Sequence, residues 1–153
     1  MLKKTKDLGS YSCCYRESRN EKSIDSLLHG YAVSFKLVFE YDDPIDYYKE
    51  INSFSEIEKW LLENFNNTLI VAQDDPYIKI LKQIDAHKGG YNNNGVCNLK
   101  TFDHIGVDSF ALMLYNKAIT TLKLNKVKLT TVLVEELGGS KALYEKRDIL
   151  NDN

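Results

Sequence analysis

Few side chains in this sequence could do chemistry, and most of them lie in its first third. His29 and the adjacent thiols of Cys13 and Cys14 are of the types that ligate zinc, which is bound by imidazole and thiolate groups. A single imidazole without partners is more often a hydrogen-bonded structural residue, and a lone thiol is more often a small buried apolar group, so both interpretations stay open. Glu136 follows two valines at alternate positions, which predicts an inward-facing carboxylate on a strand.

Other polar residues have simpler interpretations. Glu136 itself could be a surface charge at the end of a strand. The acidic pairs at residues 42–43 and 74–75 each precede a proline, which is typical of turns and helix caps and not of metal sites. His87 and His104 are expected in a loop or at a helix end, exposed to solvent.

Composition limits the classes of protein that the chain can represent. Its 153 residues are 43% hydrophobic and 27% charged, which suits one compact domain over residues 1–153. The 20 basic and 22 acidic residues give a net charge of -2, which argues against a nucleic-acid partner. No apolar run reaches the length of a membrane span, and no apolar run follows the basic N-terminus. Three cysteines do not make a disulfide framework, so we expect a cytoplasmic protein.

Hydrophobic periodicity predicts four strands. Residues 10–16 form a short, weakly patterned strand. In residues 31–41 the odd positions are all large and apolar or aromatic, and the even positions are Ala, Ser, Lys, Val and Glu, as expected of a half-buried strand. Residues 126–136 are rich in Val, Leu and Thr, and a Gly-Gly turn separates them from a return strand over 140–146.

Helical spacing predicts three helices between these strands. A capping box at residues 53–56, with Ser53 as the N-cap, begins a helix that runs to about Phe65. Asp and Pro at residues 74–76 start a shorter helix that ends at 88–90. The third lies at about residues 107–118. Strands at both ends with helices between them predict an α+β domain: a four-stranded antiparallel sheet with helices on one face.

Four short stretches, in order and spacing, carry a resemblance to a known family. They are residues 28–31, 53–58, 65–69 with 74–76, and 132–144. The last is the most specific: Val132, Val134 and Glu136 precede a turn that leads to Ala142 and Tyr144. From about residue 10 to residue 146 the chain resembles the 6-pyruvoyltetrahydropterin synthase and 6-carboxytetrahydropterin synthase family, which adopts the tunnelling fold.

The resemblance implies a zinc site whose ligands are mostly replaced here. Family members bind zinc through three histidines, one on the first strand and two in an H-G-H motif. Tyr15 aligns with the first-strand histidine, and the H-G-H motif is His29-Gly30-Tyr31. His29 is therefore the only retained ligand position, and a neutral phenol is a poor zinc ligand. We expect Tyr15 and Tyr31 to fill the space that zinc would occupy.

The family's proton-transfer residues are replaced as well. The loop at residues 23–28 lacks the cysteine that serves as base, and the Asp-His pair aligns with two asparagines at 66–67, whose amides cannot take a proton near neutral pH. The glutamate of the family's last helix aligns loosely with Asp108 or Ser109. Glu136 keeps the place of the carboxylate that anchors a pterin or guanine-like ring.

Three functions follow from the resemblance. The favoured one is a member without zinc-dependent catalysis that retains a pterin- or guanine-like binding pocket at Glu136, His29, Tyr31 and Tyr15. The alternatives are an active lyase acting on dihydroneopterin triphosphate, with atypical metal ligands and zinc as cofactor, and a structural barrel without ligand. The resemblance also implies a homo-oligomeric barrel, commonly a hexamer, and leaves open whether the pathway makes biopterin or a 7-deazaguanine such as the queuosine precursor.

Overall fold

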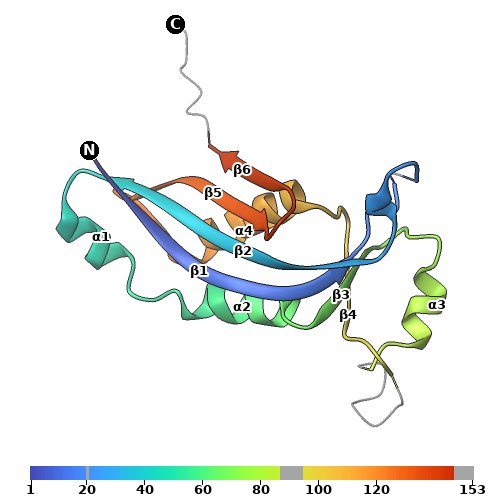
Figure 1. The fold of residues 1–153 in the computed structure, drawn as a ribbon. Coiled ribbons are helices and arrows are strands. Elements are labelled where there is room, and N and C mark those ends of the chain that lie inside the picture. The colour runs from blue at the N-terminus through green and yellow to red at the C-terminus, as the bar shows by residue number, and fades with distance from the viewer. Residues whose placement is uncertain (20, 87–94, 147–153) are drawn as a thin grey trace, which may run out of the picture.

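The computed structural model describes residues 1–19, 21–86 and 95–146, and its centre is one curled sheet (Figure 1). The strands are β1 (Leu2–Tyr15), β2 (His29–Tyr41), β3 (Thr68–Ala72), β4 (Leu99–Phe102), β5 (Lys128–Glu136) and β6 (Lys141–Glu145). The helices are the 3-10 turn η1 (Ile24–Ser26) and α1 (Pro44–Glu50), α2 (Ser55–Phe65), α3 (Ile78–Gln83) and α4 (Val107–Leu122). Among these described residues, no helix combines the length and apolarity needed to cross a membrane.

The α+β class is confirmed, but the sheet is larger than the sequence predicts. Its six strands run in the order β4-β3-β1-β2-β5-β6. The four predicted strands pair antiparallel, as β1 with β2, β2 with β5, and β5 with β6. The two extra strands extend the sheet beyond β1 in parallel orientation. Periodicity does not mark β3 because all five of its residues are buried, and a strand covered on both faces shows no alternation.

Alternation along β2 sets the inner face of the sheet. Val33, Phe35, Leu37 and Phe39 have no exposed surface, and their intervening neighbours are only half-buried. This face carries the core, in which Leu61 of α2 and many other helix residues take part. The predicted half-buried strand is thus confirmed, and it begins two residues earlier, at His29.

β1 is much longer than the predicted strand at residues 10–16. It begins at Leu2 and continues with a register shift between Asp7 and Ser10. Gly9 lies at that shift with φ of 89°, a left-handed conformation that glycine adopts without strain. Its charged N-terminal half hides the strand pattern, and the structure shows why the charges are tolerated: Lys3 pairs with Glu40 of β2 at 2.7 Å.

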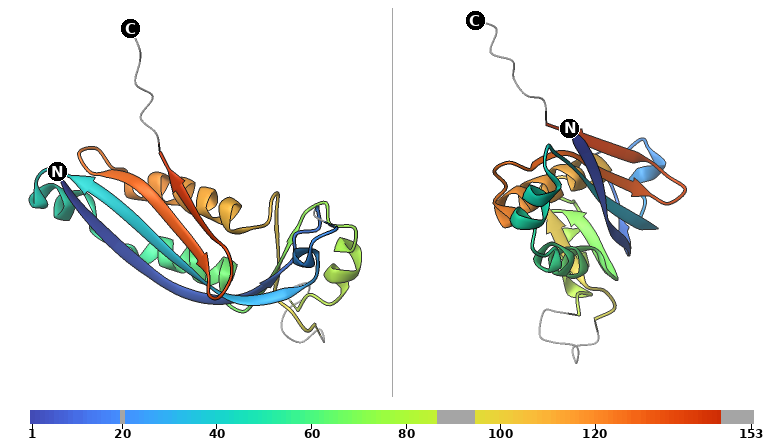
Figure 2. Two further views of the ribbon diagram at one scale, coloured as in Figure 1. Left: turned by 45° about the horizontal axis from the view of Figure 1, so that its top comes forward. Right: turned by 90° about the vertical axis from the view of Figure 1, so that its left-hand side faces the viewer.

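Helices α1, α2 and α4 cover the inner face, whereas α3 packs on the opposite face beside β3 and β4 (Figures 1 and 2). Leu81 of α3 belongs to a second apolar cluster with Leu69 and Val71 of β3. The prediction of helices on one face is therefore wrong for α3. This second layer is what buries β3 on both sides.

Helix ends differ from the sequence predictions in small ways. α2 begins at Ser55, and Ser53 accepts the Ser55 N–H at 3.1 Å instead of completing a capping box. α1 was not predicted, although Asp43 accepts the Ile45 N–H and Pro44 opens the helix. The helix predicted from residues 74–76 to 88–90 is wrong at both ends, because α3 begins at Ile78 and ends at Gln83. His87 lies outside the described residues.

Candidate functional site

The structure brings Tyr15, His29 and Tyr31 together on the inner face of the sheet. Tyr15 at the end of β1 pairs with His29 at the start of β2. The rings of Tyr15 and His29 meet edge to face, with centroids 4.7 Å apart, and the His29 and Tyr31 centroids lie 5.2 Å apart. The three residues that align with the family's zinc ligands therefore lie next to one another.

Tyr15 is sealed inside the protein. Its side chain has no exposed surface, and its ring packs edge to face on Phe110 of α4 at 5.4 Å. Its hydroxyl makes no hydrogen bond to any described residue. The ring therefore occupies volume as a core residue does, while its one polar atom is left without a partner.

This donor set does not fit zinc. His29 is half-buried, and its Nδ1 lies 2.9 Å from the Leu27 carbonyl. Because a carbonyl only accepts, Nδ1 donates in this contact, and Nε2 is the ring nitrogen that could bind a metal. The other two positions offer phenols. Nowhere in the described part of the chain do three His, Cys, Asp or Glu side chains gather closely enough to hold a metal ion.

Glu136 faces inward, as the alternation predicts. It is only 7% exposed, while Val132 and Val134 of the same face have no exposed surface. It pairs with Val33 of β2, which follows Tyr31 on that face. Its Oε2 accepts the Ser140 N–H at 3.1 Å. One carboxylate oxygen therefore helps to hold the β5–β6 hairpin, a bond that the sequence does not reveal.

Cys13 is the buried neighbour of this carboxylate. It pairs with Tyr31 across β1 and β2 and is 4% exposed. Burial, followed by the charges of Cys14 and Glu136, raises the pKa of the Cys13 thiol to about 12. The thiol stays protonated at neutral pH, which supports its interpretation as a small buried apolar group.

Sequence reasoning missed Glu17, a carboxyl group beside this cluster. Burial raises the pKa of Glu17, the negative charges of Asp25 and Asp108 raise it further, and His29 opposes them. Glu17 lies close enough to Gly106, at the start of α4, that a Cβ there would come within 3.1 Å of Glu17 Oε1. A carboxyl group with a raised pKa can exchange a proton nearer to neutral pH. In the sequence, the only signal for Glu17 is its position two residues after Tyr15, just past the end of the same strand.

Asp75 is more than the turn residue that the sequence indicates. Its carboxylate is fully buried, and its Oδ2 lies 3.0 Å from Arg16 Nε. The other oxygen accepts the Tyr77 N–H at 2.8 Å. Asp74 is exposed and pairs with Arg19, and His104, exposed as expected, contacts the same arginine at 2.5 Å. These ion pairs hold the end of β1 against the segment that follows β3.

Several solved structures have the same architecture as this chain. No protein-family model matches the chain, and no curated protein matches it. Among solved structures, the 6-pyruvoyl tetrahydropterin synthase of Plasmodium vivax is 15% identical, covers 96% of this chain and 98% of its own, and gives a TM-score of 0.64. The uncharacterized protein WS1659 of Wolinella succinogenes is 15% identical over 95% and 98%, also at 0.64.

A further match agrees with these two. The 6-pyruvoyl tetrahydropterin synthase of Plasmodium falciparum is 14% identical, covers 95% of this chain and 97% of its own, and has a TM-score of 0.56. At such low identity the likeness concerns architecture and extends over nearly the whole chain. The family resemblance indicated by the four sequence stretches is therefore confirmed at the level of structure: the chain has the tunnelling fold of the 6-pyruvoyltetrahydropterin synthases.

Proposed function

We propose that this protein binds a flat pterin- or guanine-like heterocycle, in a pocket completed between subunits, without zinc-dependent catalysis. The observation that carries the proposal is the buried carboxylate of Glu136 on the same sheet face as Tyr15, His29 and Tyr31. Glu136 keeps the inward carboxylate, whereas Tyr15 and Tyr31 occupy two of the three positions that are histidine in the family. Loss of catalysis with retention of binding accounts for both.

The carboxylate of Glu136 retains capacity for a ligand. A carboxylate offers about four lone-pair positions on two oxygens, and the described residues use Oε2 for the Ser140 N–H. No salt bridge from a described residue neutralises it. Two parallel N–H groups, such as the 2-amino and ring N–H of a pterin or guanine, would make a charge-assisted bidentate contact in which Oε2 accepts a second bond.

A homo-oligomer would complete the sheet edges. β3 pairs with β1 only at residues 13–15, so the long edge of β1 from Leu2 toward Ser12 has no partner strand among the described residues. At the opposite end of the antiparallel ladder, the outer edge of β6 is also unpaired in the described chain. Pairing β6 of one copy with β1 of the next would satisfy both edges and close a barrel. We propose a hexamer, as the family resemblance implies.

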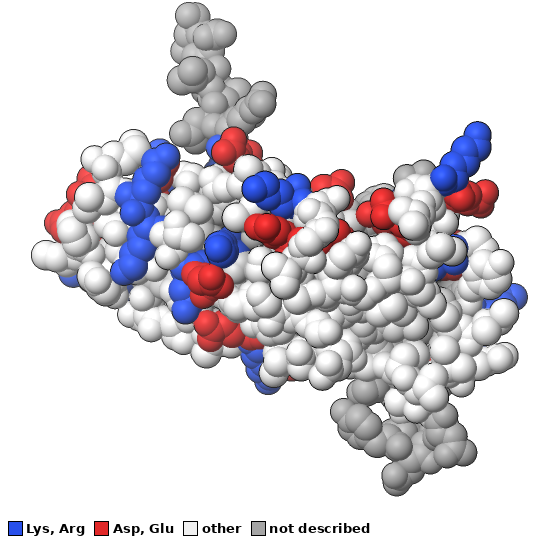
Figure 3. All heavy atoms as spheres, in the orientation of Figure 1, with Lys and Arg blue, Asp and Glu red and all other residues white. Residues whose placement is uncertain are grey.

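The outer face of the sheet, opposite the helices α1, α2 and α4, is suited to line the inside of an oligomeric barrel. Its charged side chains gather near the N-terminal end, where Lys3 pairs with Glu40 and Lys36 with Asp7. Further along the curve the outward positions of β1 and β2 are uncharged, from Ser10 to Cys14 and from Gly30 to Ser34, whereas β5 and β6 place Glu135 and Lys141 beside Ser34. Figure 3 shows a broad surface there without Lys, Arg, Asp or Glu. Small, uncharged side chains allow this face to line the inside of a barrel.

We also propose that the protein resides in the cytoplasm. Cys13, Cys14 and Cys97 are all free thiols. Free thiols persist in a reducing compartment.

A binding titration tests the ligand proposal. Guanine, pterin and 7-deazaguanine are titrated against the oligomer, and the same titrations are run with Glu136→Gln. We expect saturable binding of at least one ring and a loss of about tenfold or more in the variant, because one acceptor oxygen becomes an N–H donor. Asp74→Asn, which changes an exposed acid elsewhere, is the control. Equal binding by wild type and Glu136→Gln would contradict the anchor.

Metal analysis tests the other half of the proposal. We expect purified protein to contain far less than stoichiometric zinc, and the double variant Tyr15→His with Tyr31→His to gain zinc binding. Stoichiometric zinc in the wild-type protein would overturn the proposal. A correctly folded double variant that takes up no zinc would show that the first-strand alignment is wrong.

One observation favours the alternative of an active enzyme. Glu17 has a raised pKa beside His29, and a solved variant of the Plasmodium vivax synthase is described as altered at a catalytic residue, a glutamate. Under this second proposal Glu17 would transfer the proton in a lyase reaction on dihydroneopterin triphosphate. Turnover of that substrate, abolished by Glu17→Gln, would favour it over the binding protein; the absence of turnover in an oligomer that binds pterin would exclude it.

A further inference from the structure

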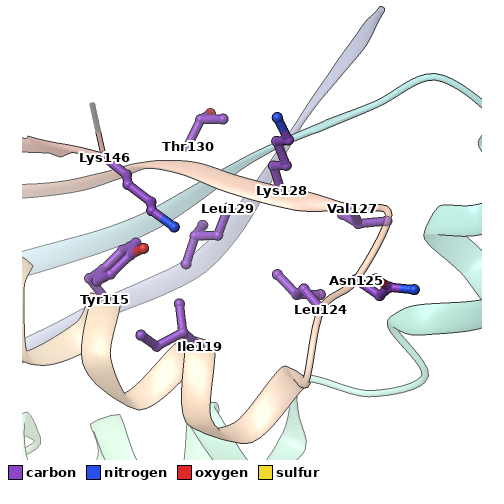
Figure 4. Close-up of a pocket in the computed structure, with 9 residues that line it drawn as sticks. All are labelled: Tyr115, Ile119, Leu124, Asn125, Val127, Lys128, Leu129, Thr130 and Lys146. Atoms are coloured by element: carbon purple, nitrogen blue, oxygen red, sulfur yellow. The ribbon is translucent and has the colours of Figure 1, made fainter. Parts of the chain in front are cut away.

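A second cleft lies between α4 and the start of β5, at the end of β5 opposite Glu136 (Figure 4). It has a volume of about 350 Å³, within the range of small-molecule sites. Ile119, Leu124 and Leu129 supply apolar walls, and no acidic residue lines it. Its distance along β5 from the Glu136 cluster makes it independent of the function proposed above.

Tyr115 places a polar group inside this cleft. The side chain is only 7% exposed, and its ring packs at a tilt against Tyr144 of β6 with centroids 4.6 Å apart. Figure 4 shows its hydroxyl pointing from α4 into the cleft. The hydroxyl makes no hydrogen bond to another residue within the described chain. The hydroxyl is therefore open to the cleft, where it can donate a hydrogen bond to a ligand acceptor in place of solvent.

Lys146 adds a positive charge at the same place. Its side chain extends from the end of β6 into the cleft, on the side of the Tyr115 hydroxyl (Figure 4). Its backbone N–H donates to the Thr130 carbonyl at 3.2 Å, which fixes the root of the side chain. Lys128 also borders the cleft, but Figure 4 shows its side chain pointing away from it.

The wall opposite Lys146 is held in place before any ligand arrives. Glu50 at the end of α1 accepts the backbone N–H groups of Asn125, Lys126 and Val127 at 2.9, 2.8 and 3.0 Å. These bonds pin the segment that joins α4 to β5. A preformed cleft loses less conformational entropy on binding than one that must be ordered.

We propose that this cleft binds a small amphipathic monocarboxylate. The carboxylate accepts from the Tyr115 hydroxyl and the Lys146 ammonium, and the hydrocarbon part lies on Ile119, Leu124 and Leu129. Lys146 and Tyr115 determine the preference for an anion over a neutral molecule of the same shape.

The test uses octanoate as the probe, titrated into the full-length protein and followed by amide chemical shifts in NMR spectra. A ligand of this size is expected to bind with a Kd of about 1 mM. Lys146→Met keeps the hydrocarbon stem, and we expect it to weaken octanoate binding about tenfold. Tyr115→Phe removes only the hydroxyl and should weaken binding about threefold. Lys128→Met is the matched control, and its Kd should stay within about twofold of wild type.

The neutral probe 1-octanol separates charge recognition from apolar contact. We expect it to bind more weakly than octanoate and to be indifferent to Lys146→Met. Saturable octanoate binding that depends on Lys146 but not on Lys128 supports the proposal. No saturable shift at about 10 mM octanoate, equal losses in the two lysine variants, or octanol binding as tightly as octanoate would each overturn it.

Discussion

Replacing Tyr15 by Phe is expected to stabilise the protein. The substitution keeps the ring that packs edge to face on His29 and Phe110 and removes only a hydroxyl that is buried without a partner. An unpaired buried hydroxyl costs about 1–3 kcal/mol of stability, and its removal abolishes that cost. The small void left by the oxygen loses some packing contacts, which offsets only part of the gain. We therefore expect a net gain of about 1 kcal/mol, which for a chain of this length corresponds to about 2–4 °C in Tm.

Urea denaturation followed by fluorescence of Trp60 measures this change. Trp60 is the only tryptophan, and its ring lies against Phe65 of the core, so its emission reports loss of the core. Tyr11→Phe is the matched control, because the Tyr11 hydroxyl donates to the Leu8 carbonyl at 2.9 Å. That variant should lose about 0.5–1.5 kcal/mol, which makes the two Tyr-to-Phe changes opposite in sign.

The result also bears on how the candidate site is used. If Tyr15→Phe loses stability as Tyr11→Phe does, the Tyr15 hydroxyl has a partner in solution, and the interpretation of Tyr15 as a space-filling residue is refuted. If it gains stability and heterocycle binding is unchanged, Tyr15 serves packing alone. A gain in stability accompanied by weaker binding would show that the Tyr15 hydroxyl influences the ligand site even though the side chain is buried.

Three further predictions concern the residues that hold the fold around the site. Asp75→Ala removes a buried carboxylate from its arginine partner and should cost about 3 kcal/mol in urea denaturation, whereas Asp74→Ala, at an exposed pair, should cost less than about 1 kcal/mol. Burial alone would raise the pKa of Glu50, but hydrogen bonds from three backbone N–H groups lower it overall. The ionised carboxylate therefore stabilises the fold above the ordinary pKa of 4.5, and this stabilisation is lost as pH falls through the lowered pKa. Glu50→Gln should cost about 1 kcal/mol at neutral pH and flatten the acid limb of a stability-against-pH curve, and an unchanged limb would contradict the assignment. In Gly139→Ala the new Cβ would lie 2.4 Å from Glu136 Oε2, so the carboxylate must move; heterocycle binding should weaken about as much as in Glu136→Gln, and unaltered binding would show that this carboxylate position is not the binding one.

The sequence predicts the antiparallel half of the sheet well. The alternation of large apolar residues at residues 31–41 indicates β2, because a strand with one face in the core places its apolar side chains at every second position. The same rule places Glu136 inward. The spacing of apolar residues also indicates α2 and α4, since a helix with one buried side repeats its apolar residues every three or four positions.

The parallel half of the sheet escaped prediction for equally physical reasons. β3 is covered by the core on one face and by α3 on the other, so its pattern is a continuous apolar run of only five residues. β4 has four residues, all half-buried. Neither carries a local signal that distinguishes a short strand from a buried loop.

The sequence alone determined which residue types stand at the zinc and base positions of the resembling family, because side-chain chemistry is a property of each residue and needs no neighbours. Only the tertiary structure decided what surrounds them. Phe110 seals Tyr15, the Ser140 N–H engages Glu136, and Glu17 comes close to the start of α4. Most of these contacts join segments far apart in the chain, and a pattern of a few residues cannot encode a distance that is set by how sheet and helices pack.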